Sequence, residues 1–322
     1  MAGMIKKFFS SKKRIILIPL TIFIIILFYI FFKISSLSGR FIEIKQSKQN
    51  KTSYKVEIVD KKPKNWVNLN QVEKKAVDAI VIAEDWAFKD HHGIDFSQIR
   101  EAIKESLLGK RKKIRGASTI TQQVVKNIFF TSERSYIRKI KEVLYAIFLE
   151  QKLEKEKIKE IYINIAEFGP GIYGIKNASW YYFKKNPKYL SPKEGAFLAM
   201  LLPSPKRYGE SFRKKKLTAF AKRRINQILK NMALARKIKK NQLASIISRP
   251  LSWEKVESPK EENPAMTEDR EKYTNREHDD SKGSKIRFSN DLEIQIEENP
   301  EFEENAPLED FNEPEAEFSV QE

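Results

Sequence analysis

Apolar and polar positions along this chain follow the period of an α-helix much more often than that of a β-strand. Several segments carry apolar residues at helical spacing: 76–83, 99–108, 119–130, 135–153, 155–164, 178–183 and 192–202. A long basic amphipathic stretch follows at 215–247. Only Tyr54, Val56 and Ile58 alternate in a way that predicts a short strand. The pattern therefore predicts a mainly α fold.

An apolar run without a charge lies near the N-terminus, from Ile15 to Phe32. As a helix it would nearly cross a hydrocarbon core of about 30 Å, so we expect a single transmembrane helix. Lysines and an arginine precede it, and the positive-inside rule then places the N-terminus in the cytoplasm and the rest of the chain outside. A cleaved signal peptide is the alternative, but its apolar region is usually shorter, and the following segment KISSLSGR is a poor cleavage site.

Charge divides the chain into two unlike parts near Trp253. Residues 1–253 hold 53 Lys and Arg against 20 Asp and Glu, a formal charge of +33, whereas the remainder carries −15. The acidic part has few large apolar residues and no periodicity, which is typical of a disordered tail. It is either solvated or attracted to the basic part as a regulatory segment. The absence of cysteine excludes disulfides and thiolate metal sites.

We accordingly predict five regions, namely a cytoplasmic leader at 1–14, a transmembrane helix at 15–32, a linker at 33–64, a globular domain at 65–253 and a disordered acidic tail at 254–322. Within the domain, a glycine-bracketed run of cations at 110–115 is either a solvated loop or a flap over an anionic lipid.

Two adjacent carboxylates, Glu84 and Asp85, end an apolar helical run and lead into a segment rich in aromatic residues and histidine. Charged side chains are seldom buried without a partner, so an acid in this place caps a helix, forms an ion pair or reacts. A helix-terminal ion pair is the simplest interpretation of these residues alone.

A second polar block follows downstream. Ser118, Gln122 and Lys126 recur every four residues, so they share one face of a helix, and the same spacing relates Arg134, Arg138 and Glu142. Such stripes are often solvated surface. Here, however, apolar residues on the other side of the same segments demand burial, and glutamines beside a core need hydrogen-bond partners.

Five motifs that follow one another along the chain resemble the motifs of a known family. They are EDxxFxxHHGxD from Glu84, GASTITQQ from Gly116, RKxxE from Arg138, IYINIAEFGPGIYG at 161–174 and AFLAMLLPSP at 196–205. Together they resemble glycosyltransferase family 51, the peptidoglycan glycosyltransferases that polymerise lipid II. The resemblance implies a two-lobed, lysozyme-like domain. Ala117 stands where many members have a second glycine, and Ile163 replaces a common leucine.

The resemblance also implies roles for particular residues in an inverting glycosyl transfer. Glu84 would be the general base, because a sugar hydroxyl must lose its proton as it attacks. Glu142 would orient Arg138, coordinate a divalent cation (Mg²⁺ or Mn²⁺) that bridges the substrate pyrophosphate, or stabilise positive charge on the sugar. Cations would bind the leaving pyrophosphate, polar groups would bind the sugars or phosphates, and Asp85 would hold Glu84. The residues expected in these binding and supporting roles are Lys126, Arg134, Arg138, Ser118, Thr119, Gln122, Gln123, Asp85 and Asn127.

Further expectations concern partners and place. The substrates would be lipid II and the growing glycan-lipid chain. The reaction would take place at the outer, periplasmic face of a bacterial inner membrane. Other cell-wall synthesis proteins are expected as partners, and nucleic acid is not. No tightly bound cofactor and no protein-bound structural metal are expected, beside the divalent cation that would bridge the substrate pyrophosphate. The residues after Trp253 contain no KTG motif, so we expect no transpeptidase activity.

Three rival functions are weighed against this one. A lysozyme-like hydrolase needs no cations for a leaving phosphate, so Lys126, Arg134 and Arg138 oppose it. A nucleic-acid-binding module would account for the charge of +33, but the apolar N-terminal run and the Glu84 motif oppose it. A scaffold without activity would not need Glu84 and Glu142.

Overall fold

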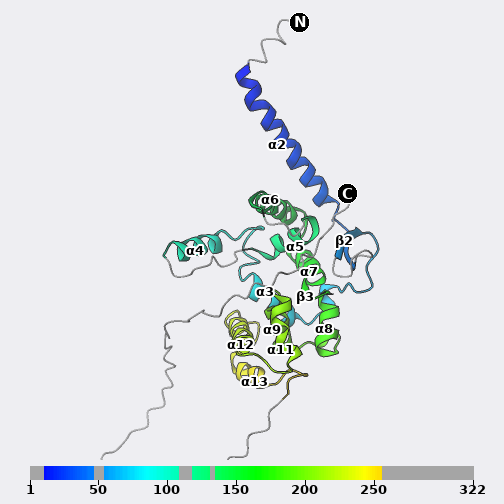
Figure 1. Cartoon of the computed structure of the whole chain (residues 1–322), viewed down its shortest axis with the longest axis vertical. Helices are drawn as coiled ribbons and strands as arrows, with labels where there is room; N and C mark the ends of the chain where they lie inside the picture. Colours follow the sequence, from blue (N-terminus) through cyan, green and yellow to red (C-terminus); the bar gives the residue numbers. More distant parts are fainter. Residues whose placement is uncertain (1–10, 47–53, 109–117, 131–134, 256–322) are drawn as a thin grey trace, which may run out of the picture. The chain divides into compact units, whose positions relative to one another are not determined.

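The structure is a computed structural model that describes residues 11–46, 54–108, 118–130 and 135–255. The predicted acidic tail beyond residue 255, Arg134 and the basic run at 110–115 lie outside the described residues. Helices dominate the described part, which confirms the mainly α fold behind one N-terminal apolar helix (Figure 1). Two groups of helices pack around a continuous apolar core: α3 (Lys74–Glu84) with α9 (Pro192–Leu201), α12 (Ala219–Leu234) and α13 (Leu243–Ser248), and α5 (Ile120–Phe129) with α6 (Tyr136–Lys152) and α7 (Lys155–Ile165).

Helix α3 and helix α9 pack closely against each other in the first group. Gly195 of α9 lies directly against the backbone of Ala76, where a Cβ atom would meet the Ala76 Cα at 2.5 Å. Ser191 begins α9 with a capping box to Glu194, and Pro192 occupies the first turn. This contact fixes α3, and Glu84 is the last residue of that helix.

The second group begins with two capped helices. Thr119 and Gln122 form a capping box at the start of α5, and the Ser135 side chain accepts a hydrogen bond from the Arg138 backbone N–H at the start of α6. Apolar residues of α5 and α7 are fully buried between these helices, among them Ile120, Val124 and Ile161. Capping thus sets where the polar face of each helix begins.

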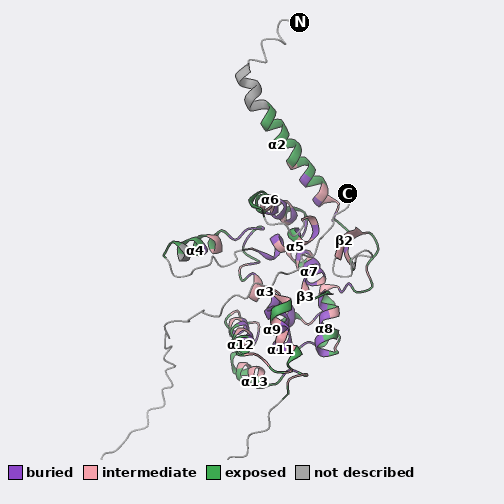
Figure 2. Ribbon diagram, viewed as in Figure 1, coloured by how far each residue is buried: buried purple, intermediate pink, exposed green. Residues whose placement is uncertain are grey.

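Helix α2 (Ser11–Ser35) contains the predicted apolar run. Its segment Ile18–Ser35 is the one helix among the described residues that is long and apolar enough to cross a membrane. Most of this segment is exposed, but Ile30 and Ile34 at its lower end are buried, as is Leu37 in the turn that follows (Figure 2). There α2 packs on α6, with the Phe31 and Phe148 rings edge to face at 6.5 Å.

The region predicted as a linker contains a β-hairpin. Strand β2 (Tyr54–Val59) coincides with the predicted strand, and it pairs antiparallel with β1 (Phe41–Gln46), which the alternation pattern did not indicate. Strand β1 packs against α7, and the Phe41 ring meets Trp66 at 5.3 Å. The domain limits themselves stay predictions.

The remaining elements connect these helices or lie beside them. They are η1 (Leu69–Gln71), α4 (Phe96–Leu107), β3 (Glu167–Gly169), β4 (Ile172–Tyr173), α8 (Ile175–Phe183), η2 (Pro187–Tyr189), α10 (Pro205–Tyr208), α11 (Glu210–Arg213) and η3 (Lys240–Gln242). Strands β3 and β4 form a tight hairpin at the predicted glycine-rich turn. The long basic stretch divides into α12 and α13 because the chain turns at Arg236, whose φ of 57° is left-handed and cannot continue a helix.

Candidate active site

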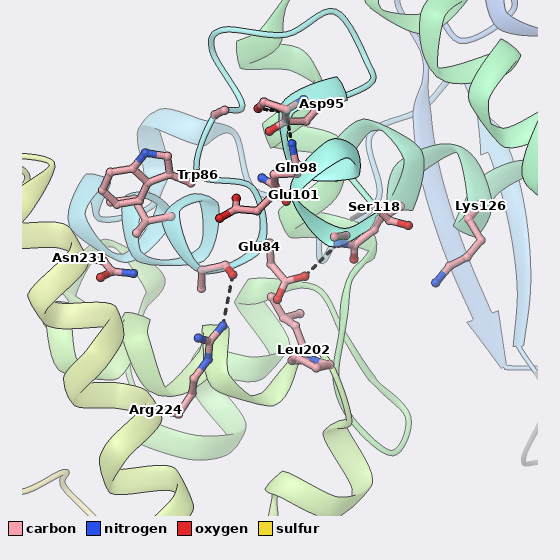
Figure 3. A pocket seen from close by; sticks show the side chains of 17 residues that line it. Glu84, Trp86, Asp95, Gln98, Glu101, Ser118, Lys126, Leu202, Arg224 and Asn231 are labelled. Carbon is pink, nitrogen blue, oxygen red and sulfur yellow. Dashed lines mark hydrogen bonds between the residues drawn. The ribbon is translucent and has the colours of Figure 1, made fainter. Parts of the chain in front are cut away.

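A pocket of about 770 Å³ opens between the end of α3, the start of α4, α5 and α12 (Figure 3). Four residues predicted from the sequence line it, namely Glu84, Ser118, Gln123 and Lys126. Residues that the sequence did not single out line it as well: Trp86, Gln98, Glu101, Arg224 and Asn231. The pocket therefore brings together one predicted base and one predicted cation from helices far apart in sequence.

Glu84 is partly exposed and faces the pocket from the last position of α3 (Figure 3). Its Oε2 accepts a hydrogen bond of 2.9 Å from Gln123 Nε2. Burial of the carboxylate raises the pKa of Glu84, while the Gln123 hydrogen bond and the charges of Arg224 and Lys126 act in the opposite direction. A carboxylate of raised pKa is a stronger proton acceptor once it is ionised, which suits a general base.

Asp85 points away from the pocket into the protein and is 1% exposed. Its carboxylate accepts hydrogen bonds from His91 Nε2 at 2.9 Å and from the Ile120 backbone N–H at 2.9 Å. Asp85 thereby ties the end of α3 to the start of α5, which carries Gln123 and Lys126. The expectation that Asp85 holds the adjacent Glu84 in place, and its expected part in substrate binding, stay predictions.

Thr119 and Gln122 are buried in the cap of α5 rather than on the pocket wall. The Thr119 hydroxyl donates to the Gly93 carbonyl at 2.7 Å, and Gln122 Oε1 accepts from the Thr119 backbone N–H at 3.2 Å. Their observed contacts are thus with the protein itself. A substrate-binding role for these two residues, as for the partly exposed Asn127, stays a prediction.

A cluster of charges adjoins the pocket at Lys126. Both oxygens of the buried Glu142 are paired, one with Arg138 Nε at 3.0 Å and the other with Lys139 Nζ at 3.3 Å. Lys139 Nζ also donates to Ser118 Oγ at 2.7 Å. The Lys126 side chain opens to the pocket, yet desolvation lowers its pKa, and the charge of Glu142 opposes that shift. Glu142 thus helps to keep Lys126 charged.

Of the three roles expected for Glu142, the orientation of Arg138 agrees best with these contacts. A divalent ion needs free carboxylate oxygens, and those of Glu142 are engaged by two cations. In the part of the chain that the structure describes, no group of three or more His, Asp and Glu side chains is placed to hold a metal ion. The wall near Lys126 is instead cationic, which suits an anionic ligand.

Comparison with known proteins decides the family. The transglycosylase family matches residues 50–233, which is more than half of the chain. The chain belongs to the transglycosylase family. Every structural feature of the pocket described above lies within the matched residues.

The relatives of this transglycosylase include three proteins named biosynthetic peptidoglycan transglycosylase. The protein of Bdellovibrio bacteriovorus is 43% identical over 145 residues, 45% of this chain and 57% of that protein. The protein of Shewanella amazonensis is 43% identical over 52% of this chain and 66% of its own length, and that of Pasteurella multocida is 40% identical over 55% and 70%. The chain thus spans about two thirds or less of the first two relatives.

Arg224 is one of the pocket residues of this transglycosylase that the sequence analysis did not identify. It extends from α12 beneath Glu84, and its Nη2 donates to the Ala83 carbonyl at 3.4 Å (Figure 3). A cation on a basic amphipathic helix is ordinary, so nothing in the local pattern distinguished it. Trp86 directly follows the acidic pair and is 52% exposed, and it lines the pocket beside Glu84.

Proposed function

We propose that this transglycosylase polymerises lipid II into linear glycan strands of peptidoglycan. The observation that carries the proposal is the placement of the Glu84 carboxylate in a pocket whose wall also presents Lys126, next to the Glu142, Arg138 and Lys139 cluster. One side of such a pocket accepts a proton and the other receives a phosphate. A hydrolase would need the acid but not the cations.

The reaction follows from these two functions. Glu84 accepts the proton of the acceptor's sugar 4-hydroxyl while the hydroxyl oxygen forms a bond to the anomeric carbon of the donor. The bond between that carbon and the lipid pyrophosphate breaks, and the configuration at the carbon inverts. Negative charge grows on the departing pyrophosphate, where Lys126 and Arg138 stabilise it, the arginine offering a bidentate geometry.

The surrounding groups keep these residues in the required state. Glu142 orients Arg138 through the 3.0 Å pair and favours the charged form of Lys126. Arg224 and Lys126 favour the ionised form of Glu84, which is the form that acts as a base. The role of Arg134 in binding the pyrophosphate stays a prediction from the sequence, as does the absence of transpeptidase activity.

We further propose that α2 anchors the enzyme in a bacterial inner membrane with its N-terminus in the cytoplasm and the pocket on the outer face. Support comes from the apolar segment Ile18–Ser35 and from the cations that precede it. The proposed substrates, lipid II and the growing glycan-lipid chain, are held in the same membrane. Other cell-wall synthesis proteins are further expected partners.

The proposal is tested with the detergent-solubilised protein and labelled lipid II. Wild type should form polymer that muramidase digests, and Glu84→Gln should lower the rate by about 10² to 10⁴, the usual contribution of a general base. Glu101→Gln is the matched control, because Glu101 lines the same pocket and is given no proton to accept. Its rate should fall less than about tenfold.

Two outcomes would contradict the proposal. Appreciable polymerisation by Glu84→Gln would show that Glu84 is not the general base. Cleavage of preformed glycan without polymer growth would instead assign the pocket to a hydrolase.

A further inference from the structure

A hydrogen-bonded chain of three side chains connects the interior of the domain to Glu84. The Tyr162 hydroxyl donates to Gln123 Oε1 at 3.1 Å, and Gln123 Nε2 donates to Glu84 Oε2 at 2.9 Å. Tyr162 belongs to α7, Gln123 to α5 and Glu84 to α3, so the chain joins three helices. Tyr162 is 2% exposed and lies outside the pocket, whereas the other two residues line it.

The donor and acceptor types in this chain are not interchangeable. An amide offers one oxygen and one NH₂ group, and an ionised carboxylate only accepts. If the Gln123 amide rotated by half a turn, its oxygen would face the Glu84 carboxylate, and two acceptors would repel each other. The hydroxyl of Tyr162 opposes that rotation, since it donates to the amide oxygen where that oxygen now lies.

Burial makes this opposition effective. Gln123 is the acceptor of the Tyr162 hydroxyl among the residues that the structure describes. In the rotated state the hydroxyl proton would have no such acceptor inside the protein, and a buried donor without a partner is unfavourable. Burial together with the charges of Glu84 and Asp85 raises the pKa of Tyr162 well above its usual value, so the phenol stays protonated throughout the working pH range.

We propose that Tyr162 is a positioning residue for the transfer reaction, which locks the Gln123 amide with its NH₂ group toward Glu84 and so holds Glu84 ionised and aimed into the pocket. This inference rests on the proposed function, in which Glu84 is the base. Rotation of the amide is coupled to the proton on Glu84: a protonated carboxyl could donate to the rotated amide oxygen, whereas an ionised one requires the present orientation. Tyr162 therefore favours the reactive state.

The variant Tyr162→Phe tests this, because it removes the hydroxyl and keeps the buried ring. In lipid II polymerisation we expect kcat to fall about tenfold while KM changes less than about twofold, since the group does not touch substrate. In the pH dependence of kcat/KM, the acidic limb should shift to higher pH by about one unit. This is the shift expected when a carboxylate loses one hydrogen bond to its charged form.

The matched control is Tyr182→Phe. Tyr182 is likewise buried, at 4% exposed, and its hydroxyl donates to the Phe168 carbonyl at 2.8 Å, away from the pocket. Loss of the Tyr182 hydroxyl should lower the thermal midpoint about as much as Tyr162→Phe does. It should leave the acidic limb of the kcat/KM pH profile at the wild-type pH. A second variant, Gln123→Leu, removes the donor to Glu84 and should displace the limb at least as far.

The double variant Tyr162→Phe/Gln123→Leu separates direct from indirect action. Because Tyr162 acts through Gln123, adding the phenylalanine to Gln123→Leu should change the profile no further. A wild-type acidic limb in Tyr162→Phe, or fully additive effects in the double variant, would overturn the inference. Failure of the proposed function is recognised separately, because Glu84→Gln would then remain active, whereas failure of this inference leaves Glu84→Gln inactive.

Discussion

Replacing Gly195 by alanine should disturb the site although Gly195 does not line the pocket. A Cβ atom at this position would lie 2.5 Å from Ala76 Cα, 2.9 Å from Ala76 Cβ and 3.2 Å from the Ala76 carbonyl oxygen. Carbon atoms in ordinary contact are about 3.5 to 4.0 Å apart, so the two helices must separate by about 1 Å. Two effects then compete.

The first effect favours alanine, which is about 1 kcal/mol better than glycine inside a helix. The second is overpacking, which costs about 1 to 3 kcal/mol and reaches the upper end where backbone meets backbone and no side chain can yield. We expect a net loss of about 2 kcal/mol. For a domain of this size that corresponds to a fall of about 4 to 8 °C in the thermal midpoint.

The effect on activity should be larger than the effect on stability. Ala76 and Glu84 lie on the same helix, so a displacement of α3 moves the base, and a misplacement of about 1 Å can lower a rate about 10²-fold. Thermal unfolding followed by tryptophan fluorescence, together with polymerisation rates measured well below the midpoint, separates the two effects. At such temperatures the variant is folded, so a lower polymerisation rate reports the displacement of Glu84 and not unfolding.

Ala199→Gly is the matched control in the same helix. Ala199 is 1% exposed, and its replacement weakens the propensity of α9 by about 1 kcal/mol without adding an atom against α3. We expect it to lower the midpoint and keep most of the turnover. A Gly195→Ala protein that is as stable and as active as wild type would refute the assignment of the α3 and α9 contact as the support of Glu84.

Two further predictions concern single carboxylates. Burial raises the folded-state pKa of Glu84 above the ordinary 4.5, so the ionised form of Glu84 destabilises the fold. Glu84→Gln should therefore unfold at a higher temperature than wild type at pH 7. The difference between the two thermal midpoints should shrink on acidification toward pH 4.5. A difference independent of pH would contradict this. In urea unfolding, Glu142→Gln should lower the free energy of unfolding by about 1 to 3 kcal/mol, and it should abolish most turnover, because two cations lose a buried partner. Glu156→Gln breaks a pair with Lys159 in which the carboxylate is exposed, and it should lower the free energy of unfolding by less than about 0.5 kcal/mol. Equal losses in the two variants would refute this assignment.

The helices were largely predictable, because periodicity and caps are local. Thr119 with Gln122 and Ser191 with Glu194 are capping boxes visible in the sequence, and each marks the start of an observed helix. Strand β1 was not predictable from its own pattern. Its pairing with β2 and its packing on α7 arise only when distant residues meet.

The site was predictable in part, for a related reason. Periodicity placed Gln122 and Lys126 on one face, but a polar residue near a helix start serves either the cap or a ligand, and only the fold shows which. Glu84 and Asp85 are adjacent acids with opposite orientations. The distinction depends on His91 and the Ile120 amide, which the sequence does not place near them.

Arg224 shows the limit most clearly. It approaches the end of α3 from 141 positions away in the sequence, and its own helix offers several other cations. No periodicity separates the one that reaches the pocket from those that face solvent. The packing of α12 against α3 and α9 makes that selection.

The lower end of α2 has a mechanical consequence for the anchored enzyme proposed above. Ile30 and Ile34 are buried, together with Leu37 just beyond the helix, so the last turns of the membrane helix belong to the domain's own core. The helix is then a rigid stalk rather than a flexible tether, and swinging the domain freely on it would expose apolar surface to water. The entrance of the pocket is thereby kept at a nearly constant height above the bilayer. A substrate whose lipid stays in that bilayer meets Glu84 at the same level in every cycle.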